Sequence, residues 1–263
     1  MWTGVLLGTL GTLSSESWPT IWLILEVNLM SFMPLISVNW RSKKNTIVYF
    51  IVQRLGSLII LIRGMLTDLL SFLAPIGILL KSSLAPLHYW GPLFVTNLSN
   101  LLCFIFLTWQ KIGPIFLLVT VRAKYNLLLY ALLNLYIALG GLGSKRIVLL
   151  LFFSRLLHIR WFLMSTGMIG IKYFLFYIVI TFPILLTKSP CIPLLMMNMG
   201  GVPPLTGFIM KIMVLQSMRI FVGGMFLFFS LLLLFAYART FLNARRNPLN
   251  ATSLSVCLIG MVF

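Results

Sequence analysis

The sequence predicts an all-α, polytopic membrane protein, and three observations lead to that class. The 263 residues are 60% hydrophobic and only 9% charged, whereas soluble domains carry about 25% charged residues to cover their cores. The runs are apolar on every face rather than alternating, which favours helices over the strands of a barrel. The net charge of +17 comes from cations scattered along the chain, singly or in adjacent pairs. This scatter lacks the basic stripe of a nucleic-acid-binding protein, so we expect no nucleic-acid partner.

Eleven apolar runs, each bounded by polar or charged residues, are the expected transmembrane helices of a single domain over residues 1–263. A spanning helix needs about 20 mostly apolar residues. In order, the runs are residues 2–13, 18–36, 46–62, 66–80, 101–121, 125–142, 147–164, 168–187, 192–213, 220–242 and 252–263. The first and last are short, and the count falls to nine if they do not span.

The loop cations alternate along the chain in a way that predicts its orientation. Numbering the gaps between runs assigns one side of the membrane Arg41, Lys43, Lys44, Lys145, Arg146, Lys188, Arg245 and Arg246. The opposite side receives Arg63, Arg122, Lys124 and Arg219. The richer side is the matrix or cytoplasmic side by the positive-inside rule, and the N-terminus falls on it.

Two Pro- and Gly-rich stretches, residues 81–92 and 200–207, interrupt their runs. Proline removes an amide donor and clashes with the preceding turn, so both stretches should break a helix and free backbone carbonyls. Broken helices within a bilayer are tolerated only where they are buried in protein or line a hydrated cavity, and they are typical of transporters.

Glu26 stands near the middle of an apolar run, where an ionised side chain costs about 3 kcal/mol on insertion scales. Lys81, just before the first break, is its expected counter-charge. Attraction to Glu26 favours the charged lysine and burial disfavours it, which is the electrostatic requirement for a proton relay. The structural alternatives are a locked ion pair or protonated glutamate at Glu26, and a Lys81 that snorkels to the interface.

Three further ionisable residues complete the candidate proton-handling site. Lys111 lies halfway along a long apolar run, and Lys211 follows the second break. His158 is a candidate relay because histidine titrates near neutral pH, although a satisfied core histidine is an equal alternative; His88 is a weaker candidate.

The remaining buried cations and the cysteines receive structural interpretations. Arginine does not release its proton in practice, so headgroup contacts or helix-end positions are expected for Arg54, Arg155, Arg160, Lys172 and Arg239. Three distant cysteines, Cys103, Cys191 and Cys257, offer no disulfide framework or metal ligand set and are expected to be small buried hydrophobes. We expect no metal and no cofactor in this chain.

Several of these stretches resemble a known family. They are Leu25-Glu-Val-Asn-Leu-Met-Ser-Phe-Met-Pro34, Leu84-Ala-Pro-Leu-His-Tyr-Trp-Gly-Pro92, Leu107-Thr-Trp-Gln-Lys-Ile-Gly-Pro114 and Met199-Gly-Gly-Val-Pro-Pro-Leu-Thr-Gly-Phe-Ile-Met-Lys211. In order and spacing they are similar to the chain 2 family of mitochondrial NADH:ubiquinone oxidoreductase, respiratory complex I. The similarity covers most of residues 15–242. Leu93 stands where the family has an acidic residue, and the stretch after Arg246 is abbreviated.

The resemblance implies an antiporter-like, proton-translocating subunit of the membrane arm in the mitochondrial inner membrane, without redox chemistry of its own. It implies the proton relay at Glu26, Lys81, Lys111 and Lys211, other membrane-arm subunits as partners, and membrane lipids, including cardiolipin, around them. Two alternatives remain: a free-standing cation/proton antiporter, and a structural spacer whose charges are locked ion pairs.

Overall fold

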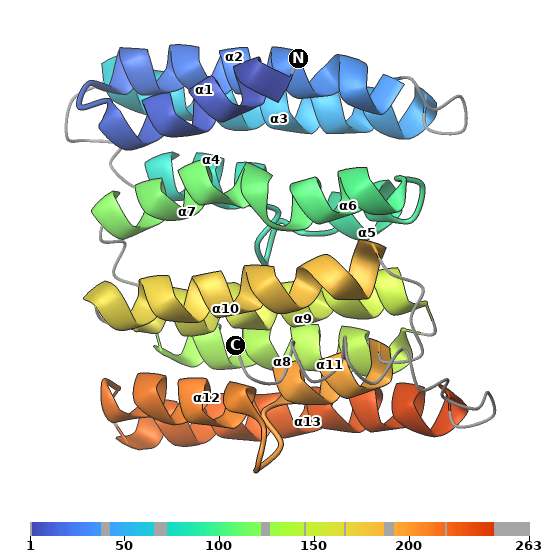
Figure 1. Ribbon diagram of the computed structural model, residues 1–263. Helices are drawn as coiled ribbons and strands as arrows, with labels where there is room; N and C mark the ends of the chain where they lie inside the picture. Colours follow the sequence, from blue (N-terminus) through green and yellow to red (C-terminus); the bar gives the residue numbers. More distant parts are fainter. Residues whose placement is uncertain are drawn as a thin grey trace. The chain divides into compact units, whose positions relative to one another are not determined.

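The chain is a multi-pass, all-helical membrane protein in the part that the structure describes. The computed structural model describes residues 2–37, 43–65, 73–121, 127–144, 146–165, 167–186, 192–218 and 220–244, and every regular element in these ranges is a helix (Figure 1). Five apolar segments are long enough to cross a membrane, namely Trp18–Ser37, Asn100–Val121, Ile147–Met164, Gly167–Leu186 and Phe221–Leu242. Shorter apolar helices accompany them. The predicted fold class is confirmed.

The chain divides into two compact units, Met1–Lys124 and Tyr125–Phe263. The first unit contains α1 (Trp2–Ser14), α2 (Trp18–Ser37), α3 (Lys43–Met65), α4 (Leu73–Ser82), α5 (Trp90–Val95), α6 (Asn100–Leu107) and α7 (Trp109–Val121). Helix α3 packs against α2, α4 and α5, and α7 packs against α1 and α4. An aromatic cluster fills the interior, in which Tyr49 stacks on Phe94 with ring centroids 4.7 Å apart and also contacts Phe32, Trp90 and Phe106.

The second unit contains α8 (Leu127–Gly143), α9 (Ile147–Met164), α10 (Gly167–Leu186), α11 (Ile192–Gly200), α12 (Thr206–Gln216) and α13 (Ile220–Ala244). Helix α13 packs against α8, α9 and α11, and α10 packs against α9, α11 and α12. Its core includes Trp161, Tyr173, Val214 and Phe226.

Each of the first ten expected spans contains a helix in its described part. Residues 66–72 of the fourth span and the whole eleventh span, residues 252–263, lie outside the described residues. One difference lies within the fifth span, where the helix is interrupted at Thr108, between α6 and α7. Pro114 has no amide hydrogen to donate to the Gln110 carbonyl, and the Phe104 carbonyl accepts from the Thr108 hydroxyl at 2.7 Å as well as from the Thr108 amide at 3.0 Å. The regular helix is therefore perturbed on both sides of Lys111, at Thr108 before it and at Pro114 after it.

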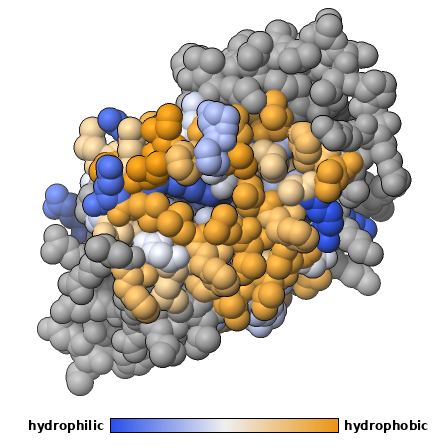
Figure 2. Space-filling model, turned by 90° about the horizontal axis from the view of Figure 1, so that it is seen from below, coloured by the Kyte–Doolittle hydropathy of each residue, from blue (hydrophilic) through white to orange (hydrophobic). Residues whose placement is uncertain are grey.

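The outer surface matches a lipid environment. Large apolar side chains are exposed on most helices, including Leu7 at 67% and Phe235 at 70%. Among the residues coloured by hydropathy in Figure 2, most are hydrophobic and hydrophilic ones occupy fewer places. A surface of this kind would aggregate in water and is expected against acyl chains.

Candidate functional site

Helix α4 ends directly after Lys81 in a Schellman cap. Ser83 adopts a left-handed conformation, with φ of 51°. The Leu84 amide donates to the Leu79 carbonyl at 3.0 Å, and the Ser83 amide donates to the Leu80 carbonyl at 3.2 Å. These two bonds satisfy carbonyls of the last turn and leave that of Lys81 available to other donors. The predicted first break therefore lies where the sequence placed it.

The freed Lys81 carbonyl connects three helices. Gln53 Nε2 from α3 donates to it at 3.0 Å, and Lys111 Nζ from α7 lies 3.4 Å from it. Lys111 is 1% exposed, and its ammonium also lies 4.0 Å from the centroid of the Phe106 ring. A carbonyl dipole and aromatic faces thus surround this cation within the unit.

Lys81 is buried against a close helix contact. Its side chain is 3% exposed. A Cβ on Gly56 would lie 2.8 Å from Lys81 Cγ, and one on Gly77 would lie 2.8 Å from the Gly56 carbonyl oxygen. Glycine at both positions allows α3 and α4 to approach closely enough to enclose the lysine stem. The ammonium remains within electrostatic reach of Glu26 and Arg54.

Glu26 forms its ion pair with Arg54 rather than with Lys81. Arg54 Nη1 lies 2.9 Å from Glu26 Oε2, and Ser57 donates to Glu26 Oε1. The expected direct pairing of Glu26 with Lys81 is therefore not found in the structure. Arg54 lies in the middle of α3, so its expected helix-end position was wrong. The sequence does contain a signal for these two contacts with Glu26, because Arg54 and Ser57 are one helical turn apart and share a face of α3.

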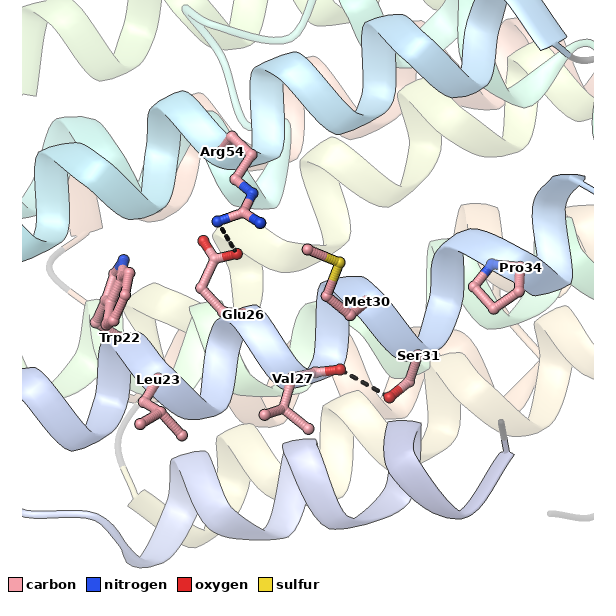
Figure 3. Close-up of a pocket in the computed structure, with 8 residues that line it drawn as sticks. All are labelled: Trp22, Leu23, Glu26, Val27, Met30, Ser31, Pro34 and Arg54. Carbon is pink, nitrogen blue, oxygen red and sulfur yellow. Dashed lines mark hydrogen bonds and ion pairs between the residues drawn. The ribbon is translucent and has the colours of Figure 1, made fainter.

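An open groove of about 620 Å³ runs beside this ion pair on the surface of the first unit. Figure 3 shows the Arg54 guanidinium reaching across from α3 to the Glu26 carboxylate on α2. Apolar side chains from α2 line the rest of the groove, namely Trp22, Leu23, Val27, Met30 and Pro34, together with Ser31. Glu26 therefore lies at the edge of its unit, and its side chain is 11% exposed.

The second break separates α11 from α12. Gly201 has a φ of 76°, a conformation that suits glycine. Asn198 Oδ1 accepts from the Gly207 amide at 2.8 Å, so the end of α11 caps the first turn of α12. A Cβ on Gly207 would collide with the Asn198 carbonyl, so glycine is required for this close approach. The second predicted break is present as well.

Lys211 reaches back from α12 to the broken end of α11. Its Nζ donates to the Gly200 carbonyl at 2.6 Å, and the residue is 6% exposed. The ammonium lies 5.9 Å from the centroid of the Trp161 ring. As at Lys111, a freed carbonyl and an aromatic face contact the cation.

His158 lies on α9 in the same unit and within electrostatic reach of Lys211. Its Nδ1 is 2.6 Å from the Tyr173 hydroxyl on α10, and its ring centroid is 5.3 Å from that of Tyr177. Sequence reasoning named His158 but not Tyr173. The two are 15 residues apart on consecutive helices, and no spacing rule in the sequence marks such a pair.

Arg155 and Arg160 are buried inside the second unit, so the expected headgroup contacts were wrong for them. Arg239 lies near the end of α13, which agrees with the helix-end alternative. Arg155 is fully buried, and its guanidinium lies 4.7 Å from the centroid of the Phe152 ring. Arg160 donates to Asn134 on α8. Arg239 donates to the Ser144 carbonyl at 2.6 Å. Each donates to, or lies over, a neutral group because the second unit contains no acidic residue.

The candidate residues therefore form two groups. Glu26, Lys81 and Lys111 are brought together in the first unit, and His158 and Lys211 in the second. His88 is 2% exposed, with its ring 5.0 Å from that of Tyr89. Among the described residues, no group of three or more His, Cys, Asp or Glu side chains is arranged to hold a metal ion.

Comparison with known proteins gives consistent relatives. The chain is 31% identical over 280 residues to the NADH-ubiquinone oxidoreductase chain 2 of Anopheles gambiae, covering 89% of this chain and 82% of that one. It is 31% identical over 258 residues to the protein of the same name from Metachirus nudicaudatus, covering 81% and 74% respectively. No family model matches.

Two solved structures have a similar fold. One is a chain in the structure of the Mrp complex from Dietzia sp. DQ12-45-1b, with a TM-score of 0.75, 16% identity, and coverage of 89% of this chain. The other belongs to the membrane-bound sulfane sulfur reductase, an archaeal respiratory membrane complex, with a TM-score of 0.66, 17% identity and 91% coverage. This chain spans only 58% and 53% of those chains.

Proposed function

Because the chain belongs to the NADH-ubiquinone oxidoreductase chain 2 family, we propose that it is a proton-translocating subunit of the membrane arm of respiratory complex I. In this proposal, electron transfer from NADH to ubiquinone takes place elsewhere in the complex and drives changes at Glu26. Protons then move through a relay of Lys81, Lys111 and Lys211, with His158 beside Lys211.

The observation that carries this proposal is the pairing of buried lysines with neutral acceptors. Lys111 and Lys211 contact the carbonyls of Lys81 and Gly200, which two helix breaks set free. A carbonyl accepts a hydrogen bond from an ammonium or from a neutral amine, whereas a carboxylate partner would hold the ammonium in its charged form. A lysine held this way keeps its position through a change of protonation, as a relay requires.

Glu26 is the switch in this mechanism. It lies within reach of two cations, Arg54 and Lys81, and only the lysine can release its proton. When Glu26 moves towards Lys81, the charged lysine is favoured; when it withdraws to Arg54, that attraction weakens and Lys81 passes its proton on. Arg54 thus serves as a fixed resting partner for the carboxylate.

In the proposed relay, His158 exchanges a proton with Lys211, which lies within its electrostatic reach. The Tyr173 hydroxyl occupies His158 Nδ1, which leaves Nε2 as the ring nitrogen for the exchange. We assign Tyr173 the role of holding the imidazole in the orientation that this exchange needs.

The setting of the chain follows from the same proposal. It resides in the mitochondrial inner membrane with the N-terminus on the matrix side, among other membrane-arm subunits and membrane lipids such as cardiolipin. It carries no cofactor or metal and performs no redox chemistry itself.

The test is the number of protons pumped per electron in the assembled complex carrying Lys81→Met or Lys81→Arg. Arginine keeps the charge but cannot release the proton, so both variants should pump fewer protons. Glu26→Gln should also lower the ratio. A normal ratio in all three variants would exclude the relay.

The structural spacer is a second candidate, and the Glu26–Arg54 ion pair favours it because a spacer would contain such locked pairs. Lys81→Arg separates the two candidates, since a spacer needs only the charge and would tolerate arginine. The third candidate, a free-standing antiporter, predicts cation/proton exchange by the chain alone in liposomes. Our proposal predicts none without the partner subunits.

A further inference from the structure

The second unit contains many cationic residues and no acidic residue to neutralise them. Residues 125–263 include eleven Lys and Arg residues and no Asp or Glu. Arg155, Arg160, Arg239 and Lys211 are accounted for by carbonyl, amide and aromatic contacts inside the unit. Lys172 is different, because its side chain is exposed on α10 among apolar residues. The counter-charge of Lys172 must therefore come from outside this unit.

Lys172 lines a groove between α10 and α12. The groove has a volume of about 230 Å³, and its other lining residues are Ile169, Met210, Met213, Gln216 and Ser217. Polar groups come from the beginning of α10 and from the end of α12, which therefore lie at the same end of the groove. The space is far larger than a single water molecule needs.

The position of Lys172 along its helix matches the depth of lipid headgroups. It lies five residues after the start of α10, which is about 7.5 Å at 1.5 Å per residue. A lysine at this depth extends its ammonium towards the interface while its stem stays among apolar groups. Beside it, the exposed Gln216 amide is a further donor, whereas the Ser217 hydroxyl donates to the Val214 carbonyl at 2.7 Å. Met210, Met213 and Ile169 form an apolar wall.

We propose that this groove binds the headgroup of an anionic phospholipid. The phosphate accepts hydrogen bonds from Lys172 Nζ and the Gln216 amide, and one acyl chain lies along Ile169, Met210 and Met213. The groove offers contacts to both the phosphate and an acyl chain of such a lipid. A soluble phosphate would make no use of the methionine wall, and a lipid without net charge would gain no attraction from the lysine. An acidic side chain of a partner subunit is the competing source of counter-charge.

The experiment uses the intact complex in nanodiscs of phosphatidylcholine that contain a photoactivatable phospholipid probe. The probe is phosphatidylglycerol in one arm and phosphatidylcholine in the other. Labelled peptides from residues 167–186 and 206–217 are quantified by mass spectrometry. We expect phosphatidylglycerol to label this groove about fivefold more than phosphatidylcholine, which is the effect of one cation near an anionic lipid surface.

Two variants and a matched control test the residues. Lys172→Gln should remove the preference for the anionic probe, and Gln216→Glu should also remove it because the new carboxylate competes for the lysine. Lys172→Arg keeps the charge and should keep the preference. Equal labelling by both probes in the unmodified complex would overturn the proposal, as would an undiminished preference in Lys172→Gln.

Ionic strength provides a measurement that needs no variant. Screening by salt weakens an interfacial attraction, so raising KCl from about 0.02 M to about 0.5 M should reduce the preference for the anionic probe in the unmodified complex. If an acidic side chain of a partner subunit covers the groove, neither probe labels it at any salt concentration, and the proposal is wrong.

Discussion

The Glu26–Arg54 ion pair leads to a prediction that a double-mutant cycle can test. Replacing Arg54 with Gln leaves the Glu26 carboxylate beside apolar side chains, with the Ser57 hydroxyl and the more distant Lys81 as its remaining support. Replacing Glu26 with Gln leaves Arg54 without its ion-pair partner. Making both changes together removes both charges and places two neutral amides opposite each other, so the double variant should lose less stability than the two single variants combined.

The structure sets the size of this effect. At 2.9 Å, two unit charges attract by about 6 kcal/mol at an effective dielectric constant of about 20. Desolvation offsets much of that attraction, and the Arg54 side chain is 36% exposed, so the net coupling should be about 1–3 kcal/mol. Arg54→Gln leaves the mostly buried carboxylate unpaired and should lower stability by about 3 kcal/mol, whereas Glu26→Gln should cost less because the unpaired Arg54 is partly exposed.

The measurement is the fraction of complex that retains this chain on a native gel after graded heating or denaturant. Coupling of about 1–3 kcal/mol corresponds to roughly a 5- to 150-fold change in the unfolding equilibrium constant. The unfolding curve of the double variant should therefore be clearly distinct from the curve expected if the effects of the single variants simply added. Ser31→Ala, which changes another residue of the same groove, is the matched control and should shift neither curve by more than about 0.5 kcal/mol. If the effects of the single variants simply add in the double variant, the ion pair carries no energy and the reasoning fails.

Three further outcomes are expected. Tyr173→Phe keeps the ring and removes only the hydroxyl that contacts His158, so pumping per electron should fall while assembly on native gels stays near normal; a normal ratio would contradict the role assigned to Tyr173. Gly207→Ala should destabilise the second unit by about 3 kcal/mol or more because its Cβ meets the Asn198 carbonyl, whereas Gly224→Ala, where nothing lies within 4 Å, should be neutral or stabilising by up to about 1 kcal/mol in the same heating assay. Asn134→Leu removes the acceptor for Arg160 and should cost about 1–3 kcal/mol, and an unchanged heating midpoint would show that this bond contributes nothing.

The membrane class and the positions of the helix breaks were predictable because they depend on local properties of the chain. Apolar runs must form helices in a bilayer, since only a helix satisfies its own backbone groups there. Proline acts on its own turn and the one before it, so the breaks after Lys81 and Gly200 follow directly from Pro86 and Pro203. The interruption at Thr108 was missed because it needs two weak effects together, the proline six residues later and the threonine hydroxyl.

The partners of the charged residues were less predictable, because they depend on how helices rotate against one another. Glu26 and Lys81 were expected to pair because Glu26 lies within an apolar run and Lys81 lies just before the first helix break. The close contact of Gly56 with Gly77 instead fixes α3 so that Arg54 and Ser57 face the carboxylate. A run that is apolar on every face carries little information about which face turns inward. For the same reason, the contact between His158 and Tyr173 could not be predicted from the sequence.

In the described part of the chain, the buried lysines and the arginines differ in position and in partners, and the chemistry of the two side chains explains the difference. The buried lysines Lys81, Lys111 and Lys211 lie at or opposite a broken helix, where carbonyls without helical partners are available. Four arginines lie on continuous helices and contact an acid, an amide, a carbonyl or a ring face, namely Arg54, Arg160, Arg239 and Arg155. Arginine stays charged under all ordinary conditions, so a fixed partner is enough for it. Lysine can exist in two protonation states, and a partner that accepts hydrogen bonds from both states is useful only if both occur. In the relay that we propose, the broken helices supply the carbonyls that let Lys111 and Lys211 keep their partners while they gain or lose a proton.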